Sequence, residues 1–386
     1  MPEVFILILL LMIGFGRRLQ GLSYTWLDDA ILRYESRFGK LVWTAILSLM
    51  LLLAAIVYTR PDTICDNLGF YYARLAEDPF YFAAGNPLSF RILTPLISYA
   101  VGLRGANIIF TNLILAGVLI GTVYSVFRRV SPRPGDAFLA AVVVTFSLVV
   151  TTTIHCGGYC DVLTYLVVFL MWHFRGKRLL FYALFLLGLF NRESIAVLVP
   201  WLVFISLETP GSKPKRVAEL VIGLALAIVI YYLFRQWVGA QTEIGFSGDF
   251  YLKPLLADPL QNFRTTWYYQ GIGFFSVYKL LWCFPALAIV AFWRNRDFRS
   301  LIGLALLLGG AWGQLFLAYD TSRMFTLGFM VMPVSLVYLL RTDEQRFRKW
   351  AFAAVLINLL IPQIYTAADK IEVWQSLSSH LLLPYL

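Results

Sequence analysis

The chain has 386 residues, of which 60% are hydrophobic and only 14% are charged, and its mean hydropathy is +0.73. This composition excludes a water-soluble globular protein, in which about 25% of residues are charged. The net charge of +10 comes from short Lys and Arg clusters between apolar runs, which argues against a nucleic-acid partner. No polar stretch is long enough for a soluble domain, so residues 1–386 are predicted to form a single integral membrane domain.

The first apolar segment, residues 3–16, has no basic residue before it, whereas Arg17 and Arg18 follow it directly. A secretory signal peptide carries its positive charge ahead of the apolar run, so this order argues against a cleaved signal. Positive charge behind the segment predicts a retained first helix whose N-terminus lies outside the cytoplasm.

Further apolar segments follow along the chain, and several are shorter than the roughly 20 residues that a helix needs to cross a bilayer. They lie near residues 41–58, 106–128, 137–153, 161–174, 179–190, 195–208, 217–238, 273–293, 300–318, 324–341 and 351–366. A short segment can still cross where flanking residues extend it or where the bilayer thins. The sequence therefore predicts an all-α polytopic membrane protein, a bundle of about 11–12 transmembrane helices.

Basic residues are concentrated in every second connection between these segments. The six connections are residues 17–40, 128–136, 175–178, 208–219, 294–299 and 341–349. They hold 21 of the 32 Lys and Arg but only nine of the 22 Asp and Glu, so the positive-inside rule predicts that they are cytoplasmic. The other connections are predicted to face the periplasm or the cell exterior, and a bacterial inner membrane is the expected location.

Two of the predicted external connections are long, residues 59–105 and residues 239–272. The first contains an aromatic run and an apolar stretch from Arg91 to Leu103 that is too short to cross a bilayer. We expect amphipathic helices on the membrane surface there. The second contains Trp267, Tyr268 and Tyr269, which suit the aromatic belt at a membrane interface.

Several ionisable residues stand at the predicted external ends of the helices. They are Asp62, Asp66, Arg91, Asp161, Arg192, Glu193, Asp320 and Arg323. An ionisable group at membrane depth is costly unless it is paired or wetted, so these residues are candidates for a functional site. Structural alternatives stay open: the aspartates could cap helices, the arginines could extend to the interface, and Asp320 could pair with Arg323 three residues later.

His155, Cys156 and Cys160 are residue types that bind metals. Two glycines interrupt the helix that would bring the cysteines together, and no fourth ligand is evident, so the sequence predicts no metal site. Cys65, Cys156 and Cys160 all fall in predicted external segments, where thiols can oxidise. A disulfide between two of them is therefore favoured over a metal.

Four short motifs carry most of these residues. They are Asp66 to Tyr71, Phe90-Arg91-Ile92-Leu93-Thr94-Pro95, Gly188-Leu189-Phe190-Asn191-Arg192-Glu193 and Asp320-Thr321-Ser322-Arg323. Together they resemble the external motifs of the GT-C superfamily, the polyprenyl-phosphate-sugar-dependent membrane glycosyltransferases, with a mannosyltransferase-like pattern. The resemblance covers about residues 55–340. It departs in the first external loop, where many members have an acidic dipeptide and this chain has separated Asp62 and Asp66.

The resemblance implies a GT-C-like bundle and an enzyme that transfers a sugar from a polyprenyl-phosphate donor to a lipid or glycan acceptor. The candidate catalytic residues are Asp66, as the general base, with Asp62 and Asp161. The candidates for binding the donor phosphate are Arg323, Arg192 and Arg91. The supporting candidates are Glu193, Asp320, Tyr71 and Tyr159.

This assignment is consistent with what the residue types can do. A sugar on a lipid phosphate already has a good leaving group, so the enzyme needs only a carboxylate that takes the proton of the acceptor hydroxyl. Arginine suits the phosphate oxygens on which negative charge accumulates. Single displacement predicts inversion at the anomeric carbon. No cofactor is required, although a divalent cation could be held by Asp161 or Glu193.

Two other functions fit the same composition. The first is a secondary transporter or a flippase of a lipid-linked or small polar substrate, although the sequence shows neither related halves nor ionisable groups on broken helices at mid-membrane. The second is a ligase that moves a glycan from a polyprenyl-diphosphate donor with a similar set of external arginines. Membrane lipids are expected partners in every case.

Overall fold

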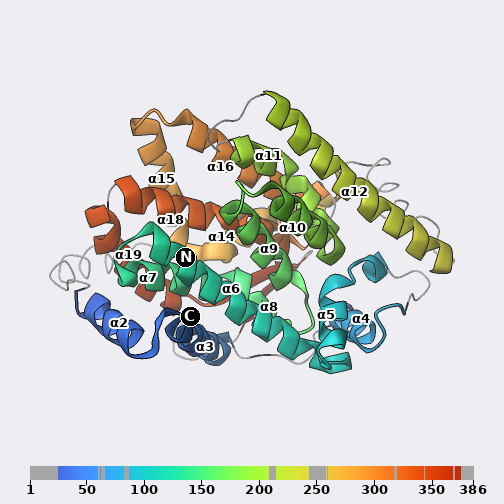
Figure 1. Ribbon diagram of the computed structural model, residues 1–386, viewed down its shortest axis with the longest axis horizontal. Helices are drawn as coiled ribbons and strands as arrows, with labels where there is room; N and C mark the ends of the chain where they lie inside the picture. Colours follow the sequence, from blue (N-terminus) through green and yellow to red (C-terminus); the bar gives the residue numbers. More distant parts are fainter. Residues whose placement is uncertain are drawn as a thin grey trace.

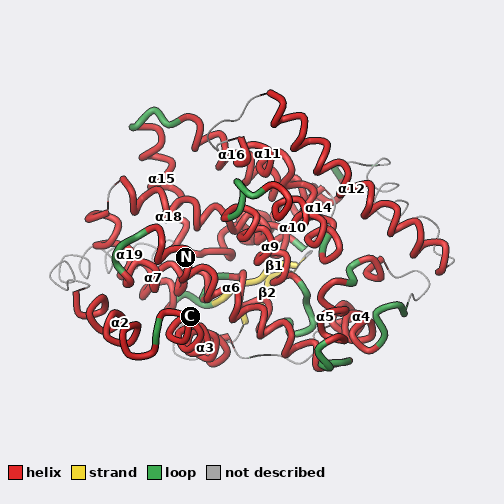
Figure 2. The backbone as a smooth tube through the Cα atoms, in the orientation of Figure 1, coloured by secondary structure: helices red, strands yellow, loops and turns green. Residues whose placement is uncertain are grey.

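The computed structural model describes residues 25–59, 61, 66–81, 87–207, 214–242, 258, 260–316, 320–342, 344–367 and 370–374. Most of them are helical (Figures 1 and 2). The α-helices are α2 (Thr25–Phe38), α3 (Lys40–Thr59), α4 (Asp66–Glu77), α5 (Leu93–Ala100), α6 (Ile108–Val130), α7 (Pro134–Thr145), α8 (Leu148–His155), α9 (Asp161–His173), α10 (Arg178–Asn191), α11 (Val199–Leu207), α12 (Pro214–Thr242), α14 (Gln261–Tyr278), α15 (Cys283–Arg294), α16 (Phe298–Gly313), α17 (Thr321–Thr326), α18 (Val331–Thr342) and α19 (Glu344–Leu360). Short 3₁₀ helices are η1 (Pro87–Phe90), η2 (Gly105–Asn107), η3 (Glu193–Leu198), η4 (Lys279–Trp282), η5 (Gln314–Phe316) and η6 (Leu327–Met330).

Helices long and apolar enough to cross a membrane confirm a polytopic membrane protein. Among the described residues there are six such spans, or seven if the bent pair α7 and α8 is one span. Four shorter apolar helices accompany them, Asp161–His173, Arg178–Asn191, Glu193–Leu207 and Ala351–Leu360. Every predicted apolar segment after residue 40 coincides with one or more of these helices, whereas segment 3–16 lies outside the described residues.

Two predicted helices are broken in the structure. The segment predicted at 137–153 bends by 47° between α7 and α8. The cause is Ser147, whose side-chain oxygen accepts from the backbone N–H of Val149 and so starts a new helix. The segment predicted at 273–293 lies within a longer run in which α14 and α15 are separated by η4, where Lys279 has a φ of 49°. That positive φ interrupts the regular helix because it is unfavourable for a residue with a side chain.

The C-terminal part of the last predicted helix is instead a β-hairpin. The apolar segment 351–366 is helical only to Leu360, and β1 (Gln363–Ala367) then pairs antiparallel with β2 (Lys370–Trp374), with Gln363 opposite Trp374. Both strands are rich in β-branched and aromatic residues, which favour extended backbone. The hairpin packs against α14 and α17, and Figure 2 shows it in yellow among the helices. The all-α prediction is therefore wrong for these residues.

Surface helices occupy the first long connection, as predicted. The described part of residues 59–105 contains α4, η1 and α5, and η2 begins at its last residue, Gly105. On α4, Tyr72, Leu75 and Ala76 are buried, whereas Phe70 on the other face is exposed. This one-sided burial is the pattern of an amphipathic helix packed on a bundle.

Described residues of the basic connections lie together on one face of the bundle, which we call the basic face. Contacts link them in a chain: Arg128 binds Glu35 of α2 at 2.9 Å, and the backbone N–H of Gly135 donates to Asp28 at 2.8 Å. The Arg128 guanidinium, by its hydrogen bonds, holds the pKa of Glu35 below its usual range. Two further ion pairs connect helices on this face: Asp136 of α7 binds Arg348 of α19 at 2.7 Å, and Arg178 of α10 binds Glu219 of α12.

The Asp136–Arg348 pair is expected to contribute strongly to stability. Both side chains are at least 91% buried and they share two hydrogen bonds, of 2.9 and 2.7 Å. Asp136→Asn leaves a buried guanidinium without its counter-charge, so we expect a loss of about 3–5 kcal/mol. Unfolding of the detergent-solubilised protein measures it.

Arg178→Gln provides the control for this prediction, because Arg178 and Glu219 form an ion pair that is half exposed. An exposed pair contributes about 0–1 kcal/mol, so this variant should unfold nearly as the wild type does. Equal effects of the two substitutions would contradict the argument from burial.

Candidate functional site

Asp161 is held by two arginines at the end of the bundle opposite the basic face. It begins α9, and its carboxylate accepts from Arg192 at 2.6 Å and from both Nε and Nη2 of Arg323. The three side chains are at most 5% exposed. A buried carboxylate stays ionised only if opposite charges and hydrogen bonds replace its contacts with water, and the two guanidinium groups supply both. The arrangement keeps Asp161 charged and fixes the planes of both arginines.

Asp320 completes the charge balance of this cluster. Its carboxylate lies 3.7 Å from Arg323, accepts the backbone N–H of Arg323 as the cap of α17, and accepts the hydroxyl of Tyr365 at 2.6 Å. The pairing of Asp320 with Arg323 was predicted as a structural alternative, yet Asp161 is the closer partner of Arg323. Two carboxylates and two guanidinium groups thus form a neutral set, which we call the sealed cluster: Asp161, Arg192, Asp320 and Arg323.

Aromatic rings surround the sealed cluster. The guanidinium of Arg323 lies 4.4 Å from the centre of the Tyr159 ring, the cation–π geometry, so the supporting candidate Tyr159 does contact the cluster. Tyr365 of β1 stacks on Trp374 of β2, and Trp374 stacks on His155 at 4.2 Å. The C-terminal hairpin therefore covers the cluster and connects it to the end of α8.

A second ion pair is more accessible. Arg91 donates to both carboxylate oxygens of Glu193, at 2.9 and 2.7 Å, and to the hydroxyl of Tyr72 at 3.2 Å. The side chains of Arg91 and Glu193 are 11% and 23% exposed, whereas those of Asp161, Arg192 and Arg323 are at most 5% exposed. Burial away from water raises the pKa of Tyr72 above its ordinary value. Of the predicted phosphate-binding arginines, Arg91 is the one that solute can approach.

Helix α4 is fixed directly against the loop that precedes Asp161. A Cβ placed at Gly158 would lie 2.6 Å from the Cα of Gly69, so the two backbones touch where only glycine fits. Asp66 begins α4 one turn before Gly69, which brings the start of α4 to this loop. The side chain of Asp66 and all of Asp62 lie outside the described residues, and their catalytic roles stay predictions. Tyr71, on the same helix, is exposed.

An amide network missed by the sequence analysis holds three helices at this site. Asn191 donates to the carbonyl of Cys160 and to the hydroxyl of Thr164, each at 2.8 Å, and accepts from Thr94 at 2.6 Å. These bonds connect α10, α9 and α5 directly beside Asp161 and Arg192. Asn191 could have been found from the sequence, because it belongs to the Asn-Arg-Glu motif. Thr94 has no sequence feature that distinguishes it from the other threonines.

The described cysteines and acids form neither a metal site nor a disulfide between Cys156 and Cys160. Cys160 and Cys283 carry free thiols, so no disulfide joins Cys156 to Cys160, and pairing with Cys65 falls outside the described residues. No three His, Cys, Asp or Glu side chains of the described residues gather into a metal site. Asp161 and Glu193 are both held by arginines, so neither offers a free carboxylate to a divalent cation.

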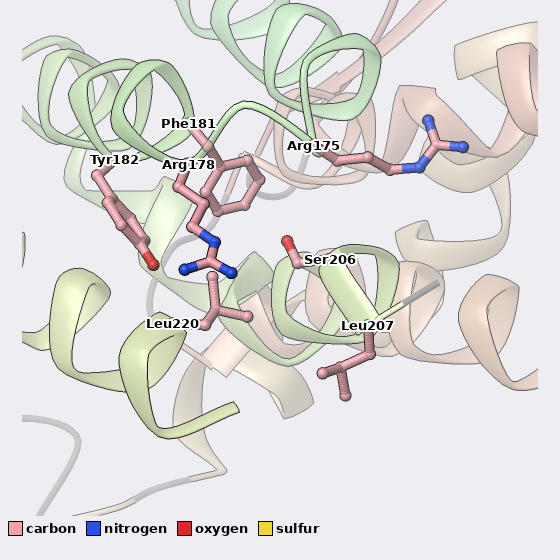
Figure 3. Close-up of a pocket in the computed structure, with 7 residues that line it drawn as sticks. All are labelled: Arg175, Arg178, Phe181, Tyr182, Ser206, Leu207 and Leu220. Carbon is pink, nitrogen blue, oxygen red and sulfur yellow. The ribbon is translucent and has the colours of Figure 1, made fainter. Parts of the chain in front are cut away.

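A small pocket lies on the basic face, away from these residues. Figure 3 shows it between α10, α11 and α12, with Arg178 beside Tyr182 and Leu220 while Arg175 points away. Its volume of about 10 Å³ is that of a single water site. This pocket is too small for a sugar or a lipid headgroup, and it plays no part in the proposal below.

No protein-family model, no curated protein and no solved structure matches this chain.

Proposed function

We propose that this protein is a membrane glycosyltransferase that moves a sugar from a polyprenyl-phosphate donor to a lipid or glycan acceptor. The observation that supports the proposal is that motifs far apart in the sequence come together. Arg91 binds Glu193, Arg192 shares Asp161 with Arg323, and α4 touches the loop before Asp161. If these ion pairs only stabilised the fold, each could lie anywhere in the bundle. The motifs would then have no reason to gather at one end of it.

The proposed reaction is a single displacement. A carboxylate, which we assign to Asp66, takes the proton of the acceptor hydroxyl. The acceptor oxygen then bonds to the anomeric carbon as the bond from that carbon to the phosphate oxygen breaks, and the electron pair leaves on the polyprenyl phosphate. Attack opposite the leaving group inverts the anomeric centre. The products are the glycosylated acceptor and the free lipid phosphate.

The arginines divide into two roles under this proposal. Arg91 is the accessible donor, and it can turn from Glu193 to the phosphate that departs, whose charge exceeds that of a carboxylate. Arg192 and Arg323 are buried and paired through Asp161, so we assign them a positioning role, in which they hold the ends of α9, α10 and α17 together behind the site.

The orientation in the membrane follows from charge. The basic face holds most of the Lys and Arg of the chain, and we assign it to the cytoplasm. The candidate site then faces the other compartment, the periplasm or exterior if the membrane is a bacterial inner membrane. A lipid-linked donor could reach it laterally, with its phosphate at the level of the helix ends.

Asp66→Asn tests both the reaction and the base. Purified wild type is expected to transfer radiolabelled sugar from one member of a panel of polyprenyl-phosphate donors to a membrane lipid or glycan extract. Asn at position 66 cannot accept the proton, so we expect a rate loss of about 10²–10⁴-fold. Asp78→Asn is the matched control, because Asp78 is an exposed acid that follows the same helix.

The other outcomes of this assay are equally informative. Transfer only from polyprenyl-diphosphate donors would indicate the glycan ligase. Equal transfer by wild type and Asp66→Asn would keep the reaction and remove the base. Retention of the anomeric configuration would reject the single displacement.

A carrier of a lipid-linked substrate is the second candidate, and the structure strengthens it. The sequence showed no broken helix with an ionisable group, but Lys279 lies at the break between α14 and α15, 1% exposed. Its ammonium donates to the Tyr58 hydroxyl at 3.1 Å and to the Ile361 carbonyl at 2.9 Å. Carriers place such groups at broken helices.

Proteoliposomes distinguish a carrier from an enzyme. If a polyprenyl-phosphate sugar is present in both leaflets, an impermeant oxidant such as periodate reaches only the half of the molecules in the outer leaflet. A carrier would expose all of it with time and would lose that activity in Lys279→Met. An enzyme would leave the inner half protected.

A further inference from the structure

A groove opens to the bilayer between α3, α6 and α9. Its volume is about 440 Å³, within the usual range of about 300–1,000 Å³ for ligand sites. Residues of α3 and α6 form its walls at helical spacing, and the end of α9 completes it. The lining residues used below are Leu41, Ala45, Ser48, Gly121, Arg129 and His173.

The walls of the groove are apolar although they contain hydroxyl groups. Thr44, Ser48 and Thr122 each donate to the carbonyl four residues earlier in their own helix, all at 2.7 Å. Their hydroxyl hydrogens are therefore used within the helix and are not offered to a ligand in the groove. At its deep end α3 and α6 approach closely, since a Cβ at Gly121 would lie 2.7 Å from the Ser48 oxygen.

The mouth of the groove is positively charged. Arg129 is exposed and makes no ion pair with a described residue, and Arg129, Arg175 and Lys177 all act electrostatically on His173. Two acids of the basic face, Glu35 and Asp136, have other partners, because Glu35 is held by Arg128 and Asp136 by Arg348. An occupant with a negative head and an apolar tail matches this charge pattern.

The length of the groove matches one leaflet. From Leu41 to Ser48 it follows α3 for about 10 Å, and from Arg129 to Gly117 it follows α6 for about 18 Å. One leaflet of the hydrocarbon core is about 15 Å thick. A single acyl chain that starts at the basic face would therefore end near the deep end of the groove.

We propose that the groove binds one acidic phospholipid from the leaflet at the basic face, with an acyl chain between α3 and α6 and the phosphate at Arg129 and His173. This site lies on the opposite side of the bundle from the candidate glycosyltransferase site. The proposal is independent of the proposed function, and a lipid held there would act on the bundle as a structural ligand.

Native mass spectrometry of the delipidated protein with equal amounts of phosphatidylglycerol and phosphatidylcholine tests it. Wild type is expected to retain one phosphatidylglycerol. Arg129→Gln should lower the retained fraction about fivefold, the usual effect of one basic residue near an anionic lipid. Arg299→Gln removes the same charge from an exposed position elsewhere on the basic face and should leave retention unchanged.

A second pair of variants tests the tail. Ala45→Trp fills the groove and should abolish retention, whereas Ala54→Trp adds the same side chain to an exposed position of α3 outside it. Equal retention of phosphatidylcholine would overturn the proposal. A dimer that dissociates in Ala45→Trp would also overturn it, because a second copy of the chain would then occupy the groove. Lipid binding only after removal of residues 3–16 would overturn it as well, because that segment would then be the occupant.

Discussion

Asp161→Asn is expected to destabilise the bundle and to abolish transfer. The substitution keeps the shape of the side chain but removes the charge that Arg192 and Arg323 share, and both guanidinium groups are almost fully buried. Removing one partner of a buried ion pair costs about 3–5 kcal/mol because the remaining charge cannot reach water. We therefore expect a large fall in the unfolding temperature of the detergent-solubilised protein and no detectable product.

A double variant separates the charge from the chemistry. Asp161→Asn together with Arg192→Gln leaves one guanidinium, Arg323, beside one carboxylate, Asp320, and so restores a neutral cluster. We expect this variant to recover much of the stability and none of the activity. If Asp161→Asn unfolded at the wild-type temperature, the cluster would have access to water and the burial argument would be wrong.

Gly158→Ala is expected to remove activity while the membrane bundle stays folded. The added methyl group would lie 2.6 Å from the Cα of Gly69, a contact with backbone that cannot rotate away, so α4 must shift. That shift moves Asp66 and Tyr72 relative to Arg91 and Asp161. A displacement of 1 Å at a reacting group can cost about 10²-fold in rate, and we expect at least that loss.

Independent measurements make this prediction specific. Gly271→Ala is the matched control, because a Cβ there meets nothing within 4 Å. Hydrogen exchange should increase in α4 of the Gly158→Ala protein and stay unchanged in α6 and α9. Wild-type exchange and wild-type transfer by Gly158→Ala would show that the contact between α4 and the Asp161 loop is unimportant.

The sequence predicts well the features that depend on local composition. Apolar runs give the helices, and the distribution of basic residues groups connections of which some are neighbours in the structure, as the Glu35–Arg128 pair shows. The break at Ser147 was not predicted because hydropathy is high on both sides of a residue that acts through one side-chain hydrogen bond. The hairpin was missed because its first strand continues the apolar run of α19.

Long-range pairing accounts for most of what the sequence did not predict at the site. In the sequence, four charged residues stand apart from one another beside predicted helix ends: Arg91, Asp161, Glu193 and Arg323. Only the packing of the bundle selects Glu193 for Arg91 and Asp161 for Arg323, partners that are 102 and 162 residues apart. The sequence motifs identify these residues but do not show that two arginines enclose Asp161. An enclosed carboxylate of this kind is poorly placed to accept a proton.

The hairpin has a consequence for the order in which the protein is made. Tyr365 binds Asp320, Thr366 donates its backbone N–H to Ser322 at 2.8 Å, and Trp374 stacks on His155. The strands follow every described helix in the sequence, so the ribosome delivers them after α8, α14 and α17 have entered the membrane. During synthesis the carboxylate of Asp320 lacks the Tyr365 hydroxyl until the hairpin is made, and completion of this region is a late event in biogenesis.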